Sequence, residues 1–269
     1  MDNYIVLIKD IIKTVKKAYG IAKERDFTIQ KKSTNEDIVT SADIEVQNYL
    51  CTELKKLLPS SGFLCEENHL FDNNYDYTWV IDPIDGTTNF SRGISDYVIS
   101  VALLYNNMPI AGVVYAPLKN YLFSAVAGHG AKLNGKRIHT SNKTFNNALF
   151  CTALSLYRKE YAEVCRDIIF ETYNKCNDFR RFGSCALELC YIAAGKCDLY
   201  FEIRVFPWDY AASYLILKEA GGILKGLNGE TLSFNKPTAL VGANNVENYK
   251  MLNAIVNKYL TKLPYTESI

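Results

Sequence analysis

The sequence has almost no excess of charge of either sign. Thirty Lys and Arg residues stand against 29 Asp and Glu residues, which leaves a net charge of +1 at pH 7. A protein that recruits nucleic acid or an anionic membrane through its overall field needs a clear positive surplus. The composition therefore disfavours nucleic acid and membranes as partners and favours a small ligand.

Long hydrophobic runs are also lacking. No stretch reaches the roughly 18 uninterrupted apolar residues that a transmembrane helix needs. The N-terminal stretch is apolar, but Asp2, Lys9, Asp10 and Lys13 interrupt it and no small-residue cleavage site follows. This pattern indicates a helix of the mature protein and not a signal peptide, and we expect a cytoplasmic protein.

The cysteines lack the spacing of a metal site or a catalytic thiolate. The chain has eight cysteines but no CxxC pair, which argues against a structural zinc site. None has an Arg six residues later to hold a phosphate, and none of the three histidines stands beside a motif Ser or Cys. We therefore expect reduced, mostly buried cysteines and no covalent intermediate.

Apolar residues at helical spacing predict two amphipathic helices near the start of the chain. The first covers residues 5–19 and ends near Gly20. The second covers residues 44–58, and Thr40 and Ser41 are its natural caps.

Strand patterns follow these helices. Short buried strands are predicted at 63–64 and 79–81, each running into acidic residues. Between residues 96 and 138, apolar runs alternate with turn signals, which predicts an antiparallel meander.

Beyond Ser141 the pattern changes to alternating strands and helices. Strands are predicted at 148–155, 180–182 and 198–201, helices within 157–175, 184–194 and 210–220, and short strands after Gly221. An α+β half, residues 1–141, thus precedes an α/β half, residues 142–269. Because no repeat or Gly/Ser linker separates them, the halves are predicted to pack tightly.

The most informative segment is WVIDPIDGTTNF, residues 79–90. A buried strand delivers Asp82 and Asp85 to its C-terminal end, where open sheets place ligand sites. Gly86 lets the backbone approach a ligand closely, and Thr87 can begin a short helix whose free N–H groups would hold an anion such as phosphate. Carboxylates and phosphate repel each other unless cations lie between them, and Mg²⁺ is the first candidate because it prefers oxygen ligands.

Each acidic motif also has an ordinary structural interpretation. Asp82 and Asp85 could be turn-forming and capping residues, and Asp209 could be a simple N-cap. Glu66 and Glu67, however, follow an apolar strand, where a solvated surface needs no carboxylate pair. Several strand ends that all terminate in carboxylates favour a shared site.

At this point the sequence resembles the inositol monophosphatase family, within the class of Mg²⁺-dependent, lithium-sensitive sugar and nucleotide phosphatases. DPIDGTTNF matches the central signature of that family. The other matches, in chain order, are Lys32, the segment 37–43, Glu66-Glu67, GxGAxxNG in the meander, Gly183-Ser184, Trp208-Asp209 and the EAGG of 219–222. The resemblance covers nearly the whole chain and implies a layered αβαβα sugar-phosphatase fold.

The resemblance also implies roles for single residues. Two or three Mg²⁺ ions per site would be held by Glu66, Asp82, Asp85, Asp209 and the carbonyl of Ile84. The attacking water would be positioned and deprotonated by Asp43 and Thr87, together with the metal ligand Glu66. The substrate would be contacted by Gly86, Thr87, Ser184 and Glu202. A capping box with Thr40 is the alternative role for Asp43.

The predicted activity is hydrolysis of inositol monophosphate, or of a related sugar or polyol phosphate, by a metal-activated water. The alternatives are a fructose-1,6-bisphosphatase, a histidinol phosphatase, a 3′-phosphoadenosine phosphatase and a non-enzymatic, cation-binding regulatory relative. The sequence departs from the family pattern at two positions. Cys65 replaces a usual Gly, which we expect to alter packing rather than cation coordination. Phe206 stands where His is often found, in a segment that lies near the substrate in relatives, and this departure leaves the substrate open. A homodimer is expected because relatives commonly form dimers.

Overall fold

The computed structural model describes residues 2–23, 28–31, 38–67, 75–154 and 159–259. Its helices are α1 (Asp2–Lys23), α2 (Ser41–Leu57), α3 (Thr87–Ser91), α4 (Ala162–Tyr173), α5 (Cys185–Ala193), α6 (Pro207–Glu219) and α7 (Val246–Tyr259). Short 3₁₀ turns cover Phe145–Asn147 and Lys159–Tyr161. Among these helices, none combines the length and the apolar character needed to span a bilayer.

The strands form a seven-stranded sheet, a five-stranded sheet and a separate two-stranded pair. The pair is β1 (Ile29–Lys31) and β2 (Ile38–Thr40). The larger sheet is β3 (Ser61–Cys65), β4 (Tyr77–Asp85), β5 (Val98–Tyr105), β6 (Met108–Ala116), β7 (Tyr121–Val126), β8 (Ala131–Leu133) and β9 (Lys136–Arg137). The smaller sheet, in spatial order, is β11 (Asp178–Arg180), β10 (Leu149–Thr152), β12 (Leu199–Val205), β14 (Thr238–Ala243) and β13 (Ile223–Lys225).

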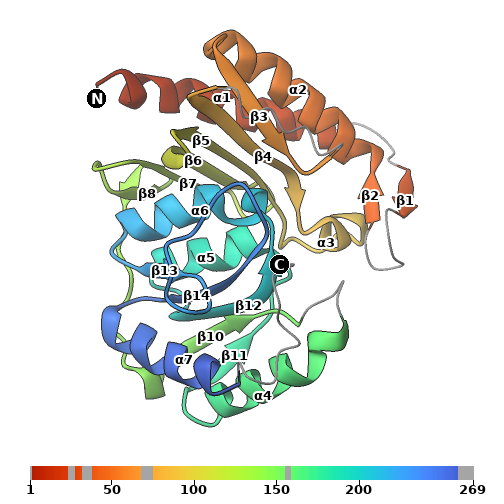
Figure 1. Cartoon of the computed structure of the whole chain (residues 1–269). Coiled ribbons are helices and arrows are strands. Elements are labelled where there is room, and N and C mark those ends of the chain that lie inside the picture. Colours follow the sequence, from red (N-terminus) through yellow and green to blue (C-terminus); the bar gives the residue numbers. More distant parts are fainter. Residues whose placement is uncertain (1, 24–27, 32–37, 68–74, 155–158, 260–269) are drawn as a thin grey trace.

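These elements stack in the order αβαβα (Figure 1). Helices α1 and α2 form one outer layer, the seven-stranded sheet follows, α5 and α6 lie in the middle, and α4 and α7 cover the far side of the five-stranded sheet. This order agrees with the predicted fold.

Strand alternation decides which layer each side chain meets. On β4, Trp79 and Ile81 pack toward α1 and α2, whereas Val80 packs toward α5 and α6. On β12, Phe201 faces α4 and α7, whereas Tyr200 faces the middle layer. Both sheets are therefore apolar on both faces, as central layers must be.

The two sheets differ in strand direction. In the larger sheet β3 and β4 run parallel, and β4 pairs antiparallel with β5. Strands β5 to β9 form the predicted antiparallel meander. In the smaller sheet β10 runs parallel to β11 and β12, while β14 runs antiparallel to β12 and β13. The C-terminal half is thus the mixed α/β layer that the sequence predicts.

Helix α6 lies against the larger sheet at very short range. A Cβ atom at Gly112 of β6 would lie 2.8 Å from the carbonyl oxygen of Ala212 in α6. Only a glycine lets the helix backbone come this close to the strand. The position of α6, and of the residues at its start, depends on this contact.

Several element predictions need correction. The strand predicted at 180–182 is β11, three residues that end at Arg180, because Phe182 and Gly183 turn toward α5. Helix α7 and the pair β1–β2 were not predicted. The helix within 157–175 is observed over Ala162–Tyr173, and the predicted residues 155–158 lie outside the described residues. Lys32 and residue 37 of the family match also lie outside them.

Candidate active site

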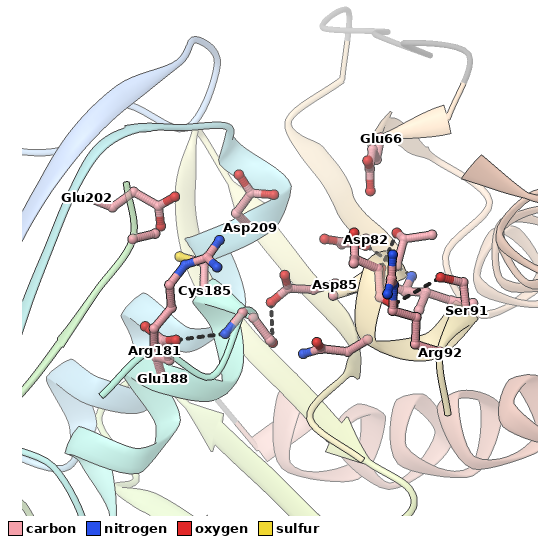
Figure 2. A pocket seen from close by; sticks show the side chains of 18 of the residues that line it. Glu66, Asp82, Asp85, Ser91, Arg92, Arg181, Cys185, Glu188, Glu202 and Asp209 are labelled. Atoms are coloured by element: carbon pink, nitrogen blue, oxygen red, sulfur yellow. Dashed lines mark hydrogen bonds between the residues drawn. The ribbon is translucent and has the colours of Figure 1, made fainter. Parts of the chain in front are cut away.

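The predicted site residues converge on a cavity of about 590 Å³ between the two halves of the chain (Figure 2). The cavity is lined by Glu66, Asp82, Ile84, Asp85, Gly86, Thr87, Ser184, Glu202 and Asp209. Glu66 and Asp82 lie on one side, Glu202 and Asp209 on the other, and Asp85 between them. Asp43 does not line the cavity but reaches it through Thr87.

A bulge in β4 brings Asp82 and Asp85 to the same site. Residues three apart on a regular strand point to opposite faces. The register between β4 and β5 shifts between Asp82, opposite Ser100, and Asp85, opposite Val98. The extra residue turns both carboxylates toward the cavity, and Asp82 Oδ1 accepts a hydrogen bond from the Ile84 amide at 3.0 Å.

Asp85 connects the two halves of the chain. Its Oδ2 accepts hydrogen bonds from Ser184 Oγ at 2.6 Å and from the Ala186 amide at 2.7 Å, both at the start of α5. Burial raises the pKa of Asp85 to about 7, against the lowering effect of these donors, and the charge of Glu66 adds to the rise. The carboxylate is thus held in place while its ionisation is disfavoured.

Asp209 is the third residue of α6, which begins at Pro207, so the N-cap is Phe206 and the alternative role of Asp209 as a simple N-cap is wrong. Its Oδ2 instead accepts a hydrogen bond from the Phe206 amide at 2.7 Å, which satisfies a free N–H group at the start of the helix. The same side chain lines the cavity. Burial first, and then the charges of Asp85 and Glu66, raise the pKa of Asp209 well above its usual range.

The pKa of Asp82 is raised in the same way, by burial and then by the charges of Glu66, Asp85 and Asp209. Within this cluster the ionisation of Asp82, Asp85 and Asp209 is therefore disfavoured by burial and by the neighbouring carboxylates. Within the described residues, no three Asp, Glu, His or Cys side chains stand in an arrangement that could already hold a metal ion. The donor set itself, several carboxylate oxygens that share one desolvated cavity, fits a hard divalent cation.

Asp43 has two sets of contacts. Its Oδ2 accepts hydrogen bonds from the amide and the hydroxyl of Thr40, at 2.8 and 2.5 Å, in a capping box at the start of α2. Its Oδ1 lies 3.4 Å from the hydroxyl of Thr87, which also donates to the carbonyl of Ile84 at 3.0 Å. Asp43 can therefore cap α2 with one oxygen and act on Thr87 with the other.

Gly86 is required by both its conformation and its surroundings. It has φ of 95°, in the left-handed region, immediately before α3. A Cβ atom there would lie 3.0 Å from the Asp96 carbonyl oxygen and 3.2 Å from that of Gly183. The backbone at Gly86 and Thr87 is thereby fixed at the edge of the cavity.

Glu202 lies on β12, opposite the β4 carboxylates. Its Oε2 accepts a hydrogen bond from the Tyr200 hydroxyl at 2.5 Å. Burial raises the pKa of Glu202 to about 7, the Tyr200 hydroxyl and the positive charge of Arg181 act against that rise, and the charge of Asp85 adds to it.

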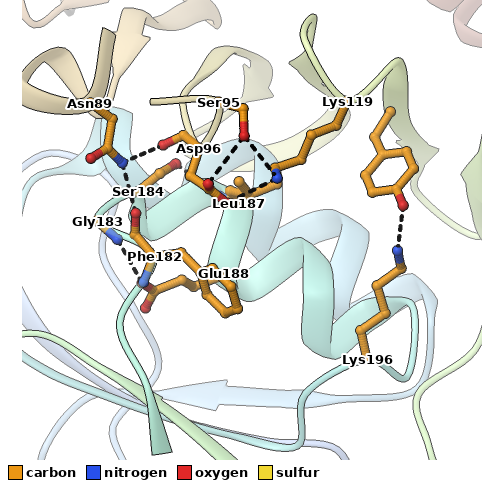
Figure 3. A network of polar contacts seen from close by, with 11 residues as sticks. Asn89, Ser95, Asp96, Lys119, Phe182, Gly183, Ser184, Leu187, Glu188 and Lys196 are labelled. Atoms are coloured by element: carbon orange, nitrogen blue, oxygen red, sulfur yellow. Dashed lines mark hydrogen bonds and ion pairs between the residues drawn. The ribbon is translucent and has the colours of Figure 1, made fainter. Parts of the chain in front are cut away.

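Two side chains that the sequence did not single out hold the loop before α5 (Figure 3). Asn89 of α3 donates to the carbonyls of Asp96 and Phe182 at 2.6 and 2.7 Å, which joins the two halves. Glu188 is buried, and its Oε1 accepts hydrogen bonds from the amides of Phe182 and Gly183 at 2.6 and 3.0 Å. The sequence signal for Glu188 is a charged residue inside the otherwise apolar segment of α5.

The two departures from the family pattern lie beside candidate ligands. Cys65 precedes Glu66, and its Sγ lies 3.7 Å from that of Cys51 in α2; all eight cysteines are free thiols. Phe206 stacks on Trp208 with ring centroids 4.8 Å apart and an interplanar angle of 2°. Cys65 and Phe206 thus lie in the surroundings of the candidate ligands Glu66 and Asp209.

Comparisons with known proteins show which family the sequence belongs to. The sequence matches the model of the family described as the inositol monophosphatase family over residues 4–261. It is 38% identical over 201 residues to the protein named Nus factor SuhB of Escherichia coli K12, which covers 74% of this chain and 75% of that protein. The Nus factor SuhB of Pasteurella multocida is also 38% identical, over 79% of this chain and 80% of that protein.

Solved structures show the same fold. An IMPase of Thermotoga maritima has a TM-score of 0.83 and 30% identity, over 97% of this chain and 99% of that chain. The extragenic suppressor protein suhB of Bartonella henselae has a TM-score of 0.82 and 29% identity, over 95% of this chain and 98% of that chain. The family model spans nearly all of this sequence, and the alignments with these relatives cover most of each relative's own chain. The chain therefore belongs to the inositol monophosphatase family.

Proposed function

We propose that this protein is a Mg²⁺-dependent phosphomonoesterase that hydrolyses inositol monophosphate or a related sugar or polyol phosphate. The observation that supports this most is the cluster of Glu66, Asp82, Asp85 and Asp209 beside the Gly86–Thr87 turn, in one cavity. Membership in the inositol monophosphatase family supports a phosphatase as the reaction class.

The cation ligands in this proposal are the four carboxylates and the carbonyl of Ile84, and two or three Mg²⁺ ions would bind. When bound, Mg²⁺ would neutralise the clustered carboxylates, polarise the phosphate ester and acidify the attacking water. Asp85 would have to share or leave its hydrogen bonds with Ser184 and the Ala186 amide to take part. Ser184 would then act on the substrate site through the position of Asp85.

The proton of the attacking water would pass to Asp43 through Thr87. The Thr87 hydroxyl lies within reach of both the Asp43 carboxylate and the Ile84 carbonyl. A water that donates to Thr87 would therefore be oriented by a hydroxyl whose own proton is held by a buried carboxylate. The amides of Gly86 and Thr87 would hold the phosphate, as the family resemblance implies.

Glu202 would accept a hydrogen bond from a hydroxyl of the leaving group. It lies across the cavity from Asp82, on the side that the C-terminal half contributes (Figure 2). Tyr200 fixes one oxygen of this carboxylate, so that the other oxygen is available for the substrate.

Phosphate release from a panel of esters tests the proposal directly. Inositol, fructose, glycerol and nucleotide phosphates should be assayed in EDTA, in Mg²⁺, in excess Ca²⁺ and in millimolar Li⁺. We expect no release in EDTA, recovery with Mg²⁺, and inhibition by Ca²⁺ and Li⁺. Full activity in the chelator would refute the metal-dependent mechanism.

The second candidate function is that of a Nus factor, because relatives that are 38% identical to this chain carry the name Nus factor SuhB. E. coli that lacks its SuhB can be supplied with this chain or with its Asp85→Asn variant. If both restore growth equally, the chain acts as a Nus factor without phosphatase chemistry. If only the unaltered chain does, the phosphatase activity is needed.

The cytoplasmic location and the homodimer remain predictions within this proposal. Light scattering of the purified protein distinguishes a dimer from the 30.4 kDa chain alone.

A further inference from the structure

Three guanidinium groups line the same cavity as the carboxylates. They belong to Arg92, Arg181 and Arg204. Arg92 follows α3 on the side of the N-terminal half, whereas Arg181 and Arg204 come from the C-terminal half. Arg181 is near enough to Glu202 for its charge to act on that carboxyl, and Arg204 follows Glu202 by two residues on β12.

Arg204 is held in a defined place. Its Cζ atom lies 5.0 Å from the centroid of the Phe206 ring, within the range of a cation–π contact. Phe206 in turn stacks on Trp208, and its amide donates to Asp209 Oδ2. The guanidinium is therefore positioned relative to Asp209, one of the candidate cation ligands.

One donor of Arg204 has no acceptor. The Nε atom is buried, and among the described residues none accepts a hydrogen bond from it. A buried donor without a partner costs free energy, which is recovered when the side chain turns its Nε edge toward an acceptor in the cavity. A guanidinium offers Nε and a terminal nitrogen together as a fork that fits two oxygens of one phosphate.

The place of Arg204 separates it from the reacting phosphate of the proposed mechanism. That phosphate would lie at Gly86 and Thr87, beside the β4 carboxylates, while Arg204 shares β12 with Glu202, the proposed contact for the leaving group. Arg204 would thus meet the part of the substrate that leaves with its hydroxyl groups.

We infer that Arg204 binds a second phosphate group on the leaving-group side of the substrate, so that this site prefers sugar or polyol bisphosphates to the corresponding monophosphates. This inference rests on the proposed phosphatase function and narrows its substrate class. Arg181 would add to the attraction from the neighbouring loop, and Glu202 would hold a hydroxyl between the two phosphates.

A matched pair of substrates tests the inference. Fructose 1,6-bisphosphate and fructose 1-phosphate share one ester and differ in the second phosphate. For the unaltered protein we expect kcat/KM to favour the bisphosphate by about 10-fold or more. Arg204→Gln should reduce kcat/KM for the bisphosphate by about 10-fold to 100-fold and change that for the monophosphate by less than about threefold. Arg204→Lys keeps the charge but not the fork, so its kcat/KM for the bisphosphate should lie between that of the unaltered protein and that of Arg204→Gln.

Arg180→Gln is the matched control. Arg180 lies one residue from Arg181 but pairs with Asp178 on β11 and does not line the cavity. Its loss should leave the preference between the two substrates unchanged. An equal fall on both substrates in Arg204→Gln, or no change on either, would overturn the inference.

Binding provides a readout that does not depend on turnover. The dissociation constants of both fructose phosphates should be measured by calorimetry with Ca²⁺ in place of Mg²⁺, for the unaltered protein and for Arg204→Gln. Loss of the preference in Arg204→Gln supports the inference even if no ester is hydrolysed, in which case only the proposed function fails. Hydrolysis with no preference for the bisphosphate in either assay means that the inference fails and the proposed function stands.

Discussion

Asp85 both lines the cavity and connects the two halves of the chain. It lies half-buried among carboxylates, and it accepts two hydrogen bonds from the start of α5. Burial and the charge of Glu66 both oppose the ionisation of Asp85. Asp85 therefore lowers the stability of the metal-free fold, and its position suits it to bind a cation.

Asp85→Asn should therefore separate folding from function. We expect turnover to fall at least about 100-fold on every ester and Mg²⁺ binding to weaken, while the free energy of unfolding without metal stays the same or rises. Mg²⁺ calorimetry and chemical denaturation measure the two effects. Asp178→Asn, on exposed β11, is the control, and unchanged Mg²⁺ affinity in Asp85→Asn would show that Asp85 is not a ligand.

The two contacts of Asp43 predict different outcomes for its two neighbours. Thr87→Ala and Asp43→Asn should lower kcat far more than they change KM, because both act on the water and not on substrate binding. Thr40→Ala should instead cost about 1 kcal/mol of stability through the lost cap and keep most of kcat. Steady-state kinetics and thermal unfolding of the three variants check this. If Asp43→Asn keeps the turnover of the unaltered protein, Asp43 is a capping residue and no more.

At the residue scale, sequence reasoning found the side chains that stand in short motifs and missed those that act alone. Prolines, glycines or strand ends stand beside Asp82, Asp85 and Asp209 and mark these residues as candidates for a site. Arg204 carries no such local signal, because its place beside the cavity depends on the fold. Asn89 stands within the 79–90 motif, but the motif does not show its role, which depends on the Phe182 carbonyl 93 residues away in the chain. Only the fold brings these partners together.

Helix α6 gives a prediction at the scale of whole elements. Gly112→Ala would place a Cβ atom 2.8 Å from the Ala212 carbonyl oxygen and push α6 away from β6. We expect a loss of about 1–3 kcal/mol in stability and weaker Mg²⁺ binding, because Asp209 moves with the start of α6. Gly20→Ala is the control: nothing lies within 4 Å of its Cβ position in α1, so stability should rise by about 0.5–1 kcal/mol. Unchanged Mg²⁺ affinity in a destabilised Gly112→Ala would show that Asp209 does not depend on this contact.

The contact between α4 and α7 predicts a pH dependence. Glu171 accepts hydrogen bonds from Lys258 and Tyr259 at 2.6 and 2.7 Å and from Lys175, and these partners lower its pKa to about 2. A lowered acid pKa stabilises the fold above the unfolded value of 4.5, and this stability is lost as the pH falls toward 2.

Glu171→Gln should therefore be less stable than the unaltered protein at pH 7, by about 0.5–1 kcal/mol as for other exposed ion pairs. The difference should narrow below about pH 4.5. Denaturant titrations from pH 7 to pH 3 measure it, with Glu247→Gln, an exposed i,i+3 pair partner in α7, as the control. A difference that does not depend on pH would mean that packing, and not charge, explains the loss.

Element prediction succeeded where cap or turn residues mark the ends of an apolar segment, and it missed α7 and the pair β1–β2. Thr40 marks the start of α2, and turn signals separate the apolar runs of the meander. In α7 the buried positions Leu252, Ile255 and Val256 do follow helical spacing, and Asn245 accepts a hydrogen bond from the Asn248 amide as a cap would, so this helix was within reach of the pattern. The pair β1–β2 was not, since three-residue strands carry too few side chains to show a period.

At the scale of the molecule, the order of the five layers could be expected only from the resemblance to a family. Periodicity shows which residues are buried but not which sheet a helix covers, and α5 and α6 are apolar on nearly all sides because they touch both sheets. Both halves of the chain are needed to form the cavity. Glu66 and Asp82 come from the N-terminal half, and Glu202 and Asp209 come from the C-terminal half.

The place of α5 and α6 in the middle layer has a consequence for synthesis on the ribosome. Residues up to Arg137 complete the larger sheet, and α1 and α2 can cover one of its faces at once. The other face, with Val80, Val114 and Phe123, stays open to water until residues 185–219 have emerged. During that interval the nascent chain exposes a broad apolar surface, which makes it a client for chaperones and a hazard for aggregation.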